Sequence, residues 1–486
     1  MKGLDAVKKA AQDAGVKTVT YVPGYPINEI AEGLDAEISV NEKVALEIAL
    51  GASATGCRSM AIVKQVGMNV LADPLVISAN HTIGSGLVVI VGDDLGPKGS
   101  QAEMDSRYYG LVAELPVLDP KNPLAIHDSI VEAYRLSEML RVPAIVRVTS
   151  RLISSEGPNI QPFISEGSGQ TFEKTEWDFT VRGRHQRHHK EALPLAGEAS
   201  EASTLNSIEI SGNVGIIASG YPATLAEGLG ASLLAIGYAN PLPWRLIRRF
   251  IDGHRIILVA EEPEPFIESQ LRMSPKVRGK LTGHLPFGPL ERSDLVRALE
   301  SLEEKEVKRP QVEAYESVQE RGYAGICDDC PYAPLFRALK KLDVPVAGDA
   351  GCAIRATRDP YGSVDVVYGL GSSIGVASGF MKKGVAVIGD FALAHTGLAA
   401  LINAIWNKRD VLMILLKNDV AATTGGQEAP DLTKVLETLV PTRYIVLPNT
   451  ETEIERVLGE EMARAGVAAV VAKGKCPMYN KGKSVS

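Results

Sequence analysis

The sequence has few basic residues and no long apolar run, and each shortage excludes a class of function. Lys and Arg number 51 against 59 Asp and Glu, which gives a formal net charge of −8. Neither nucleic acid nor an anionic membrane attracts such a protein, so we expect neither as a partner. No segment has the ~18 uninterrupted apolar residues of a membrane-spanning helix.

Cysteine is also scarce, with five residues in a chain of 486. Disulfide frameworks belong to small, cysteine-dense secreted domains, so we do not expect one here. The first residues, MKGLDAVKKAAQDAG, have the pattern of an amphipathic helix and lack the continuous apolar stretch of a signal peptide. These features predict a cytoplasmic protein.

The length suits about three domains, because 486 residues exceed one ordinary core. Apolar strand-like runs alternate with helical patterns, which predicts an α/β fold with mainly parallel sheets buried on both faces. We expect domains at residues 1–155, 208–300 and 321–478, linkers at 156–207 and 301–320, and a tail at 479–486. The expected strands include VKTVTYV, SMAIVKQ, GLVVIVGDD, VPAIVRV, VGIIASG, RIILVAEE, VPVAGDAG, VDVVYGLGSS, GVAVIGD, VLMILLKND and GVAAVVAKG.

The first linker is polar and contains three close histidines, His185, His188 and His189. Histidine clusters can bind metals, but no carboxylate or cysteine nearby in the sequence completes a ligand set with the usual spacing. We therefore interpret this segment as a solvated basic connector.

The most informative segment ends one expected strand with Gly389 and Asp390 and the next with Asn418. Ligands of open α/β sheets bind at the carboxyl ends of the strands. Gly-Asp, followed by Asn nearly thirty residues later, is a pattern of thiamine-diphosphate enzymes. The diphosphate needs a divalent cation, and Mg²⁺ prefers oxygen ligands, which Asp390, Asn418 and the Val420 carbonyl can supply. The alternative is an ordinary α/β loop.

Thiamine chemistry also needs a carboxylate bonded to N1′ of the aminopyrimidine ring, which favours its imino tautomer. Thiamine-diphosphate enzymes place this glutamate at the start of a helix in a different domain. Glu42 occupies such a strand–helix junction in ISVNEKVALEIALGASATG. The alternative is a first-turn acid favoured by the helix dipole. Since neither feature has a chemical use without the other, we expect Glu42 and Asp390 to act on one cofactor.

Several separate motifs, in the same order, resemble the large subunit of indolepyruvate:ferredoxin oxidoreductases over nearly the whole chain. The resemblance implies a thiamine-diphosphate-binding fold with a pyrimidine-binding domain, a transketolase-C-terminal-like domain and a diphosphate-binding domain. The motifs that carry it are TYVPGYP, VNEKVALEIALGASATG, VGMNVLADPL and QAEMDSRYY in the first domain; YANPLPWRLIRRF and LVAEEPEPFIESQ in the second; and CDDCPYAPLFRALKKL, GDAGC, GLGSSIGVASG and GDFALAHTG in the third.

The resemblance also implies roles for single residues. Glu42 matches the partner of N1′, and Asp390, Asn418 and Val420 match the Mg²⁺ ligands. His395 matches the family's His-Thr-Gly and is expected near the reacting carbon, with a structural role in its loop as the alternative. The residues expected to bind the cofactor are Gly371, Ser372, Ser373, Gly389, Asp390 and Asn418.

Three departures from the family stand out. Family members usually continue into a ferredoxin-like domain with two cysteine clusters, whereas this sequence ends at Ser486. CDDC replaces the family's Cys-Pro-Gly-Cys. GDFALAH replaces a loop of the Gly-Asp-Ser-Thr type, which leaves the choice of substrate open.

Four cysteines match a further family feature. Related pyruvate and 2-oxoacid ferredoxin oxidoreductases hold one [4Fe–4S] cluster beside the thiamine with four cysteines, the number that such a cluster requires. The matching residues are Cys327, Cys330, Cys352 and Cys476. The alternatives are unrelated cysteine pairs or a zinc site. Cys57 is expected to be a buried structural thiol.

The resemblance implies that the chain oxidatively decarboxylates a 2-oxo acid, such as indolepyruvate or another aryl pyruvate, to an acyl-coenzyme A. The expected partners are a smaller oxidoreductase subunit, ferredoxin or an equivalent carrier, coenzyme A, and a second copy of the chain within a hetero-oligomer. One alternative is a non-oxidative decarboxylase similar to sulfopyruvate or phosphonopyruvate decarboxylases. The other is a non-catalytic paralogue.

Overall fold

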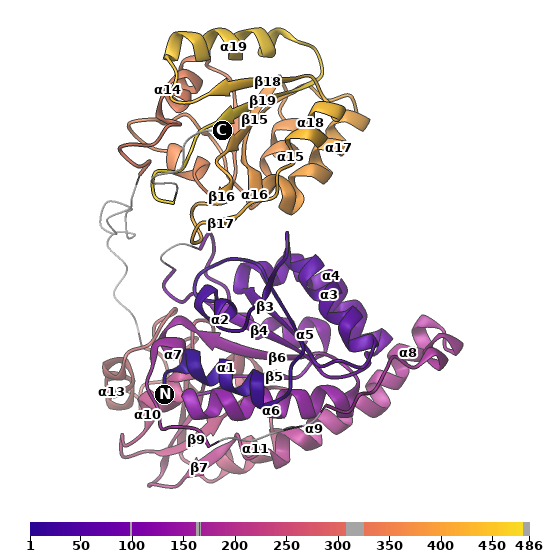
Figure 1. Cartoon of the computed structure of the whole chain (residues 1–486). Coiled ribbons are helices and arrows are strands. Elements are labelled where there is room, and N and C mark those ends of the chain that lie inside the picture. The colour runs from indigo at the N-terminus through magenta and orange to yellow at the C-terminus, as the bar shows by residue number, and fades with distance from the viewer. Residues whose placement is uncertain (98–99, 162–164, 166, 308–324, 480–486) are drawn as a thin grey trace. The chain divides into compact units, whose positions relative to one another are not determined.

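The computed structural model describes residues 1–97, 100–161, 165, 167–307 and 325–479 (Figure 1). The chain divides into two compact units, residues 1–311 and 312–486. Most of the expected linker at 301–320 and nearly all of the expected tail lie outside the described residues. The fold class is confirmed, because each unit is built of mainly parallel sheets covered by helices.

The first sheet has seven strands, and its central strands are buried along their whole length. All neighbours pair in parallel except β10, which runs antiparallel to β5 and joins the sheet from far along the chain. In sheet order the strands are β10 (Tyr238–Asn240), β5 (Val117–Leu118), β6 (Ala144–Thr149), β4 (Leu87–Asp93), β3 (Ser59–Lys64), β1 (Thr18–Tyr21) and β2 (Glu37–Ile38). The accompanying helices are α1 (Gly3–Asp13), α2 (Asn28–Glu32), α3 (Glu42–Ala54), η1 (Gln65–Gly67), α4 (Met68–His81), α5 (Tyr108–Ala113), α6 (Pro123–Leu140) and α7 (Ser150–Ser154).

A second sheet of five strands completes this unit, with only its edge strand β7 antiparallel. In sheet order the strands are β12 (Val277–Arg278), β11 (Ile256–Ala260), β8 (Val214–Ser219), β9 (Ser232–Ile236) and β7 (Ser207–Glu209). Its helices are α10 (Tyr221–Ala226), α11 (Trp244–Asp252), α12 (Phe266–Leu271) and α13 (Arg292–Glu300).

The segment interpreted as a solvated connector is more ordered than its polarity suggests. After a short 3₁₀ turn, η2 (Lys174–Asp178), residues 181–202 form a continuous helical run of α8 (Val181–Arg187), the π-helical turn η3 (His188–Ala192) and α9 (Leu193–Ala202). Thr180 caps the run by accepting a hydrogen bond from Gly183 N. The run bears few buried residues, among them Arg184 and His188, so its apolar periodicity is too weak to be read from the sequence.

Buried ion pairs join the two sheets of the first unit. Arg147, on β6, is 1% exposed and contacts Asp93 at 2.6 Å, Asp119 at 3.1 Å and the Glu262 carbonyl at 2.9 Å. Asp119 also accepts a hydrogen bond of 2.7 Å from Ser219, at the end of β8 in the second sheet. The network therefore connects the ion pairs of the first sheet to the second sheet by hydrogen bonds from Ser219 and to the Glu262 carbonyl.

We expect Arg147→Ala to lower the free energy of unfolding of the first unit by about 3–5 kcal/mol, because it removes the cation that pairs with the buried Asp93 carboxylate. Urea unfolding followed by circular dichroism measures this change. The exposed Arg135, paired with Glu132 on α6, is the control, and Arg135→Ala should cost less than about 1 kcal/mol. Equal losses in the two variants would contradict a stabilising network.

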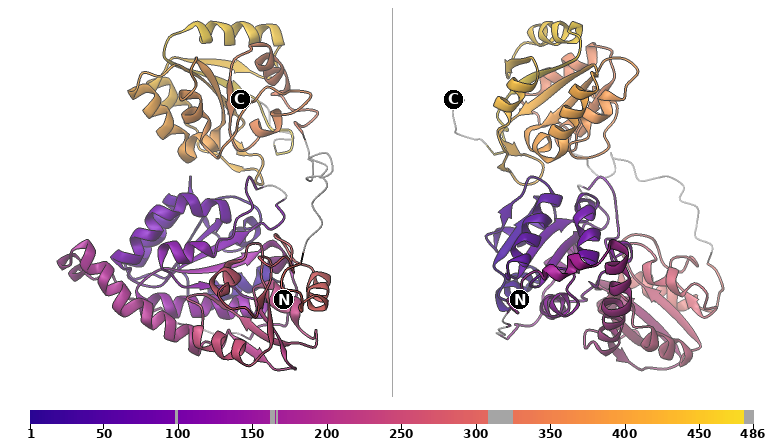
Figure 2. Two further views of the ribbon diagram at one scale, coloured as in Figure 1. Left: turned by 180° about the vertical axis from the view of Figure 1, so that it is seen from behind. Right: turned by 90° about the vertical axis from the view of Figure 1, so that its right-hand side faces the viewer.

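The second unit contains a five-stranded, fully parallel sheet. In sheet order its strands are β13 (Val346–Gly348), β14 (Gly384–Gly389), β15 (Val411–Lys417), β19 (Val467–Lys473) and β18 (Thr442–Val446). Helices α14 (Ala333–Lys341) and α19 (Glu451–Ala463) cover one face, and α15 (Ser373–Ser378), α17 (Leu398–Trp406) and α18 (Thr433–Leu439) cover the other (Figures 1 and 2). Alternate side chains of β14 and β15 enter the two cores, as the pleat requires.

The expected strand in VDVVYGLGSS is wrong. Only one isolated bridge forms there, between Ala347 and Val366. The loop that follows donates Gly371 N and Ser373 N to the side chain of Asp349, at 2.6 and 3.1 Å, so a buried carboxylate replaces the strand ladder as their partner. The ten other quoted runs each contain an observed strand.

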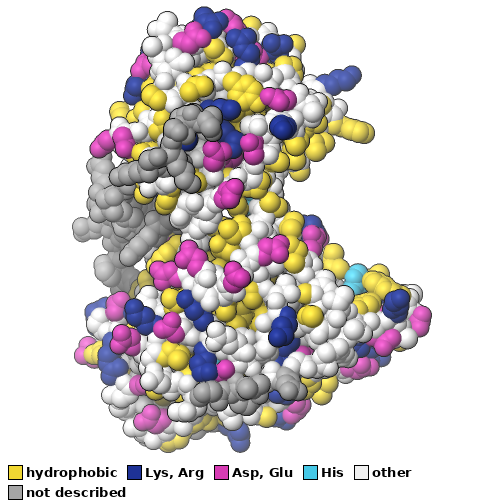
Figure 3. Space-filling view, viewed as in Figure 1, with side chains coloured by type: hydrophobic (Ala, Val, Ile, Leu, Met, Phe, Trp, Pro, Cys, Tyr) yellow, Lys and Arg dark blue, Asp and Glu magenta, His cyan; other side chains and the backbone are white. Residues whose placement is uncertain are grey.

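Within the described part of the chain, no helix is both long enough and apolar enough to cross a membrane. Basic and acidic side chains are interspersed on the face shown in Figure 3. That face therefore carries no extended basic surface of the kind that binds nucleic acid.

Candidate functional site

Parallel pairing of β14 and β15 brings Asp390 and Asn418 to the same edge of the third sheet. Gly389, the last residue of β14, lies opposite Leu416, and β15 ends one residue later at Lys417, so Asp390 and Asn418 follow at the same edge. Asp390 begins the short helix α16 (Asp390–Ala392), which continues through the π-helical turn η5 (Leu393–Gly397) into α17. The site thus lies where ligands of open α/β sheets bind.

The Asp390 carboxylate is 3% exposed and is held by backbone amides. Its Oδ2 accepts from Asp419 N at 2.7 Å and Asn418 N at 3.2 Å, and Oδ1 accepts from Phe391 N at 3.0 Å. Burial raises the pKa of the Asp390 carboxyl to about 6, although these amides and the nearby Lys417 act in the opposite direction. The protein therefore compensates the carboxylate charge incompletely.

The turn after β15 is also fixed. The Asn418 side-chain oxygen accepts from Val420 N at 3.0 Å, and Val420 starts the hairpin of β16 (Val420–Ala421) and β17 (Gln427–Glu428). Asp419, between them, has a left-handed φ of 66°. The turn from Asn418 to Val420 is therefore held against the Asp390 carboxylate.

This edge suits a metal–diphosphate group. A Cβ built on Gly389 meets no atom within 4 Å, so open space lies beside the buried carboxylate. Carboxylate and amide oxygens are the ligand types that Mg²⁺ uses in proteins. The residues present fit the group.

A second loop forms a positioned cluster in the same unit. Asp349 is buried and accepts from Gly371 N and Ser373 N, and burial raises the pKa of its carboxyl to about 6. Gly371 has φ +82°, and a Cβ there would lie 2.0 Å from Thr396 Oγ1. The neighbouring His395 is buried, with Nδ1 3.3 Å from Thr396 Oγ1, and its charge lowers the pKa of Asp349. The structure therefore brings the glycine–serine loop and His395 together.

Glu42 lies at the first position of α3 in the first unit. Asn41 caps the helix, its side chain accepting from Val44 N at 2.9 Å. Glu42 is 7% exposed, unlike an ordinary first-turn acid in solvent. A Cβ on Gly67 would lie 2.5 Å from Glu42 Oε1, so only glycine leaves room for the side chain there.

The four cysteines of the second unit lie within electrostatic reach of one another. Burial, Cys327 and Cys476 raise the pKa of Cys330. Burial, Cys330, Cys476 and Cys327 raise the pKa of Cys352 to about 12. Among the described residues, no three cysteine sulfurs lie within 4.8 Å of one another. Cys57 is only half-buried, which corrects the expected burial.

Tyr332 interacts electrostatically with both Asp390 and the cysteines. Its hydroxyl is buried and donates to the Gly474 carbonyl at 2.8 Å. Burial, then the charges of Asp390 and Cys352, raise the pKa of this hydroxyl. Tyr332 therefore lies within electrostatic range of both Asp390 and Cys352.

Sequence reasoning missed Asp349, Gly67 and Lys417. Asp349 stands in GDAGC, whose cysteine alone drew attention, and Gly67 stands in VGMNVLADPL. Lys417, immediately before Asn418, places Nζ 3.9 Å from Asp390 Oδ2 and pairs with Asp419. Only the tertiary contacts give these residues a role.

Comparisons with known proteins identify the family of the region that contains these residues. The family model "Thiamine pyrophosphate enzyme, C-terminal TPP binding domain" matches residues 349–450, which include Asp349, Asp390 and Asn418. "Indolepyruvate oxidoreductase subunit IorA" of Methanothermobacter thermautotrophicus is 32% identical over 478 residues, covering 88% of this chain and 76% of that protein. The protein of the same name from Archaeoglobus fulgidus is 31% identical over 98% of this chain and 86% of its own length.

A likeness to a solved structure supports the fold alone. The 2-oxoglutarate:ferredoxin oxidoreductase of Magnetococcus marinus, solved with 2-oxoglutarate, coenzyme A and succinyl-CoA bound, superposes with a TM-score of 0.51 at 16% identity. The match covers 62% of this chain and 64% of that chain.

Proposed function

The chain belongs to the family of indolepyruvate oxidoreductase IorA subunits, and from this premise we propose that it oxidatively decarboxylates an aryl pyruvate such as indolepyruvate. One 2-oxo acid, one coenzyme A and two oxidised ferredoxins would give one acyl-coenzyme A, one CO₂, one proton and two reduced ferredoxins. The observation that carries the proposal is the buried Asp390 carboxylate bound to the Asn418–Asp419 turn at the carboxyl edge of the sheet.

Each part of the fold has a place in this proposal. Residues 1–155 would form the pyrimidine-binding domain, 208–300 the transketolase-C-terminal-like domain and 321–478 the diphosphate-binding domain. Strand β10, from within residues 208–300, completes the first sheet, so we propose that the first two domains act as one body.

Asp390, Asn418 and the Val420 carbonyl would hold Mg²⁺, and Gly389 would leave room for the diphosphate. Gly371, Ser372 and Ser373 would contact the diphosphate, with Asp349 positioning their loop. Thiamine diphosphate, when bound, supplies the carbon nucleophile that attacks the 2-oxo group and accepts electrons on loss of CO₂.

Two residues would handle protons. Glu42 would hold a proton shared with N1′ of the aminopyrimidine ring, since its carboxylate is buried and its position is fixed by Gly67. His395 would donate or accept a proton at the reacting carbonyl, because it lies beside the loop assigned to the diphosphate.

Cys327, Cys330, Cys352 and Cys476 would hold a [4Fe–4S] cluster that removes electrons one at a time. Four cysteines are the number that such a cluster requires. The charges of Cys352 and Asp390 both act on Tyr332, which supports a cluster close to the cofactor. The electrons would pass to ferredoxin or an equivalent carrier, with a smaller partner subunit and a second copy of the chain completing the assembly.

We expect anaerobically purified protein to contain about four iron atoms and about four acid-labile sulfides per chain. Cys352→Ser should lose most of the iron, because three thiolates hold such a cluster poorly. The control is Cys57→Ser, in the first unit, which should keep its iron. Zinc in place of iron, or equal iron loss in both variants, would contradict the assignment.

The whole proposal is tested with the chain and its partner subunit purified together. Indolepyruvate and coenzyme A should reduce methyl viologen, and omitting coenzyme A should abolish sustained turnover. Release of an aldehyde without viologen reduction would instead identify a non-oxidative decarboxylase. Failure to bind thiamine diphosphate would identify a non-catalytic paralogue.

A further inference from the structure

A histidine–carboxylate cluster lies on the surface of the first unit and contains none of the residues assigned above. His185 is on α8, His189 is on the adjoining turn η3, and Glu114 directly follows α5. One ligand atom from each side chain lies within 4.8 Å of the other two, which is true of no other His, Cys, Asp and Glu group in the described ranges. Glu114 is 71 positions before His185, which is why the sequence alone did not complete a ligand set for the histidines.

The three side chains are already in contact. His189 Nε2 lies 2.9 and 3.0 Å from the two carboxylate oxygens of Glu114. His185 and His189 are four residues apart, a spacing that puts two side chains on one face of a helix, and their ring centroids are 4.4 Å apart. The helix therefore presents both imidazoles to one carboxylate.

A second contact orients His185 as a ligand. Its Nδ1 lies 3.1 Å from the side-chain oxygen of Asn80, near the end of α4. An amide oxygen can only accept a hydrogen bond, so this contact favours the neutral tautomer with the hydrogen on Nδ1, in which Nε2 has the lone pair that a metal needs. Outer partners of this kind set the tautomer of histidines in metal sites.

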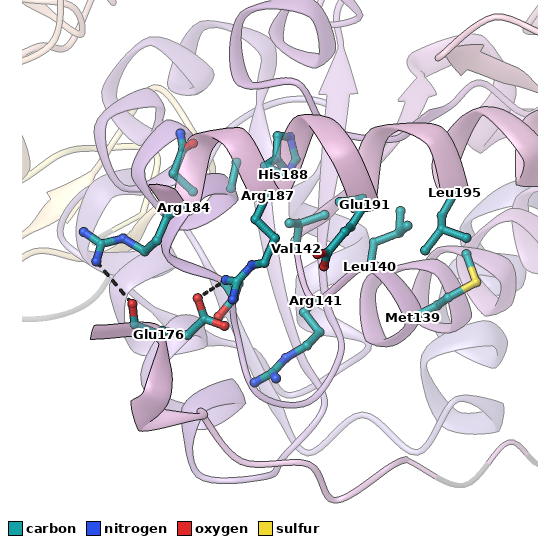
Figure 4. Close-up of a pocket in the computed structure, with 14 residues that line it drawn as sticks. Met139, Leu140, Arg141, Val142, Glu176, Arg184, Arg187, His188, Glu191 and Leu195 are labelled. Atoms are coloured by element: carbon teal, nitrogen blue, oxygen red, sulfur yellow. Dashed lines mark hydrogen bonds and ion pairs between the residues drawn. The ribbon is translucent and has the colours of Figure 1, made fainter. Parts of the chain in front are cut away.

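His188 holds the cluster in place, and the nearby Arg184 and Arg187 bond to Glu176. The buried His188 places Nε2 3.2 Å from the backbone carbonyl of Glu114, which fastens η3 to the end of α5. Arg184 donates to the Glu176 carbonyl and Arg187 pairs with the Glu176 carboxylate, as Figure 4 shows. Both arginines therefore have Glu176 as a partner.

We propose that His185, His189 and Glu114 bind one divalent transition-metal ion, best matched by Zn²⁺, with water as the fourth ligand. Two imidazoles and one carboxylate form a recognised zinc ligand set, and the exposure of both histidines leaves room for water. The ion would link the α8–η3 helical run to the end of α5. None of its ligands would be a residue assigned to the thiamine cofactor.

The test is a titration of the purified holoprotein with Zn²⁺ alone, in competition with a chromogenic chelator. Wild type should bind one more equivalent of Zn²⁺ than the double variant His185→Ala/His189→Ala. The matched control Gln186→Ala, which changes an exposed residue on the same turn, should bind like wild type. Zinc taken up by cysteines is common to all the variants and cancels in the comparison.

A second variant distinguishes loss of the metal site from misfolding. Glu114→Gln keeps the size of the side chain and should weaken the same equivalent at least about 10-fold, with an unchanged circular dichroism spectrum. Zn²⁺ should also raise the melting temperature of wild type and of Gln186→Ala but not of the double variant. Equal Zn²⁺ stoichiometry and affinity in wild type and Glu114→Gln would overturn the proposal.

Discussion

Asp390→Ala should weaken Mg²⁺-dependent binding of thiamine diphosphate by about 100-fold or more and remove viologen reduction. The variant loses a charged oxygen ligand, and it also frees the amides of Asn418 and Asp419 that the carboxylate holds at 3.2 and 2.7 Å. Calorimetric titration of the cofactor with Mg²⁺ present measures the affinity, and the dye assay measures turnover.

Asp431→Asn is the matched control for this experiment. Asp431 also places a carboxylate oxygen 3.9 Å from Lys417 Nζ, but its side chain is 62% exposed. Its replacement should leave cofactor affinity within a few-fold of wild type. Unchanged binding in Asp390→Ala would show that the metal and diphosphate sit elsewhere.

Glu42→Gln should lower kcat about 10²–10⁴-fold while leaving cofactor affinity nearly unchanged. Glutamine keeps the shape of the buried side chain against Gly67 but cannot share a proton with the aminopyrimidine ring. Viologen reduction at saturating cofactor and substrate gives kcat, and the same calorimetric titration gives the affinity.

The control is Glu47→Gln on the same helix, where the side chain is 47% exposed and pairs with Lys43 at 3.2 Å. It should keep kcat within about twofold. A Glu42→Gln variant as active as wild type would separate the α3 terminus from the chemistry, whatever the result for Asp390.

Asp390 and Asn418 could be found from the sequence because each ends a strongly apolar strand, and parallel strands end at a common edge. The contact of Asp349 with Gly371 and Ser373 could not, because it joins a strand end to a loop through hydrogen bonds that leave no periodic pattern. The contact of Gly67 with Glu42 was hidden for a related reason, since a missing side chain shows its purpose only beside its neighbour.

Charged residues were the hardest to interpret from the sequence. Arg147 and Asp93 lie within apolar strands, where a single-residue pattern cannot distinguish a buried ion pair from a solvent-facing position. The histidines of the α8–η3 run looked isolated because Glu114 reaches them only through tertiary packing. Local patterns therefore predicted the elements and the strand-end residues, whereas long-range polar contacts required the structure.

Strand β10 has a practical consequence for dissecting this protein. Tyr238–Asn240 pairs with the edge of β5, and the Asn240 side chain donates to the Gly110 and Leu115 carbonyls at 3.1 and 2.7 Å. A recombinant fragment ending near residue 155 would leave β5 as a bare edge, open to pairing with other molecules and hence to aggregation. Work on the N-terminal half should therefore use a fragment that extends through α13.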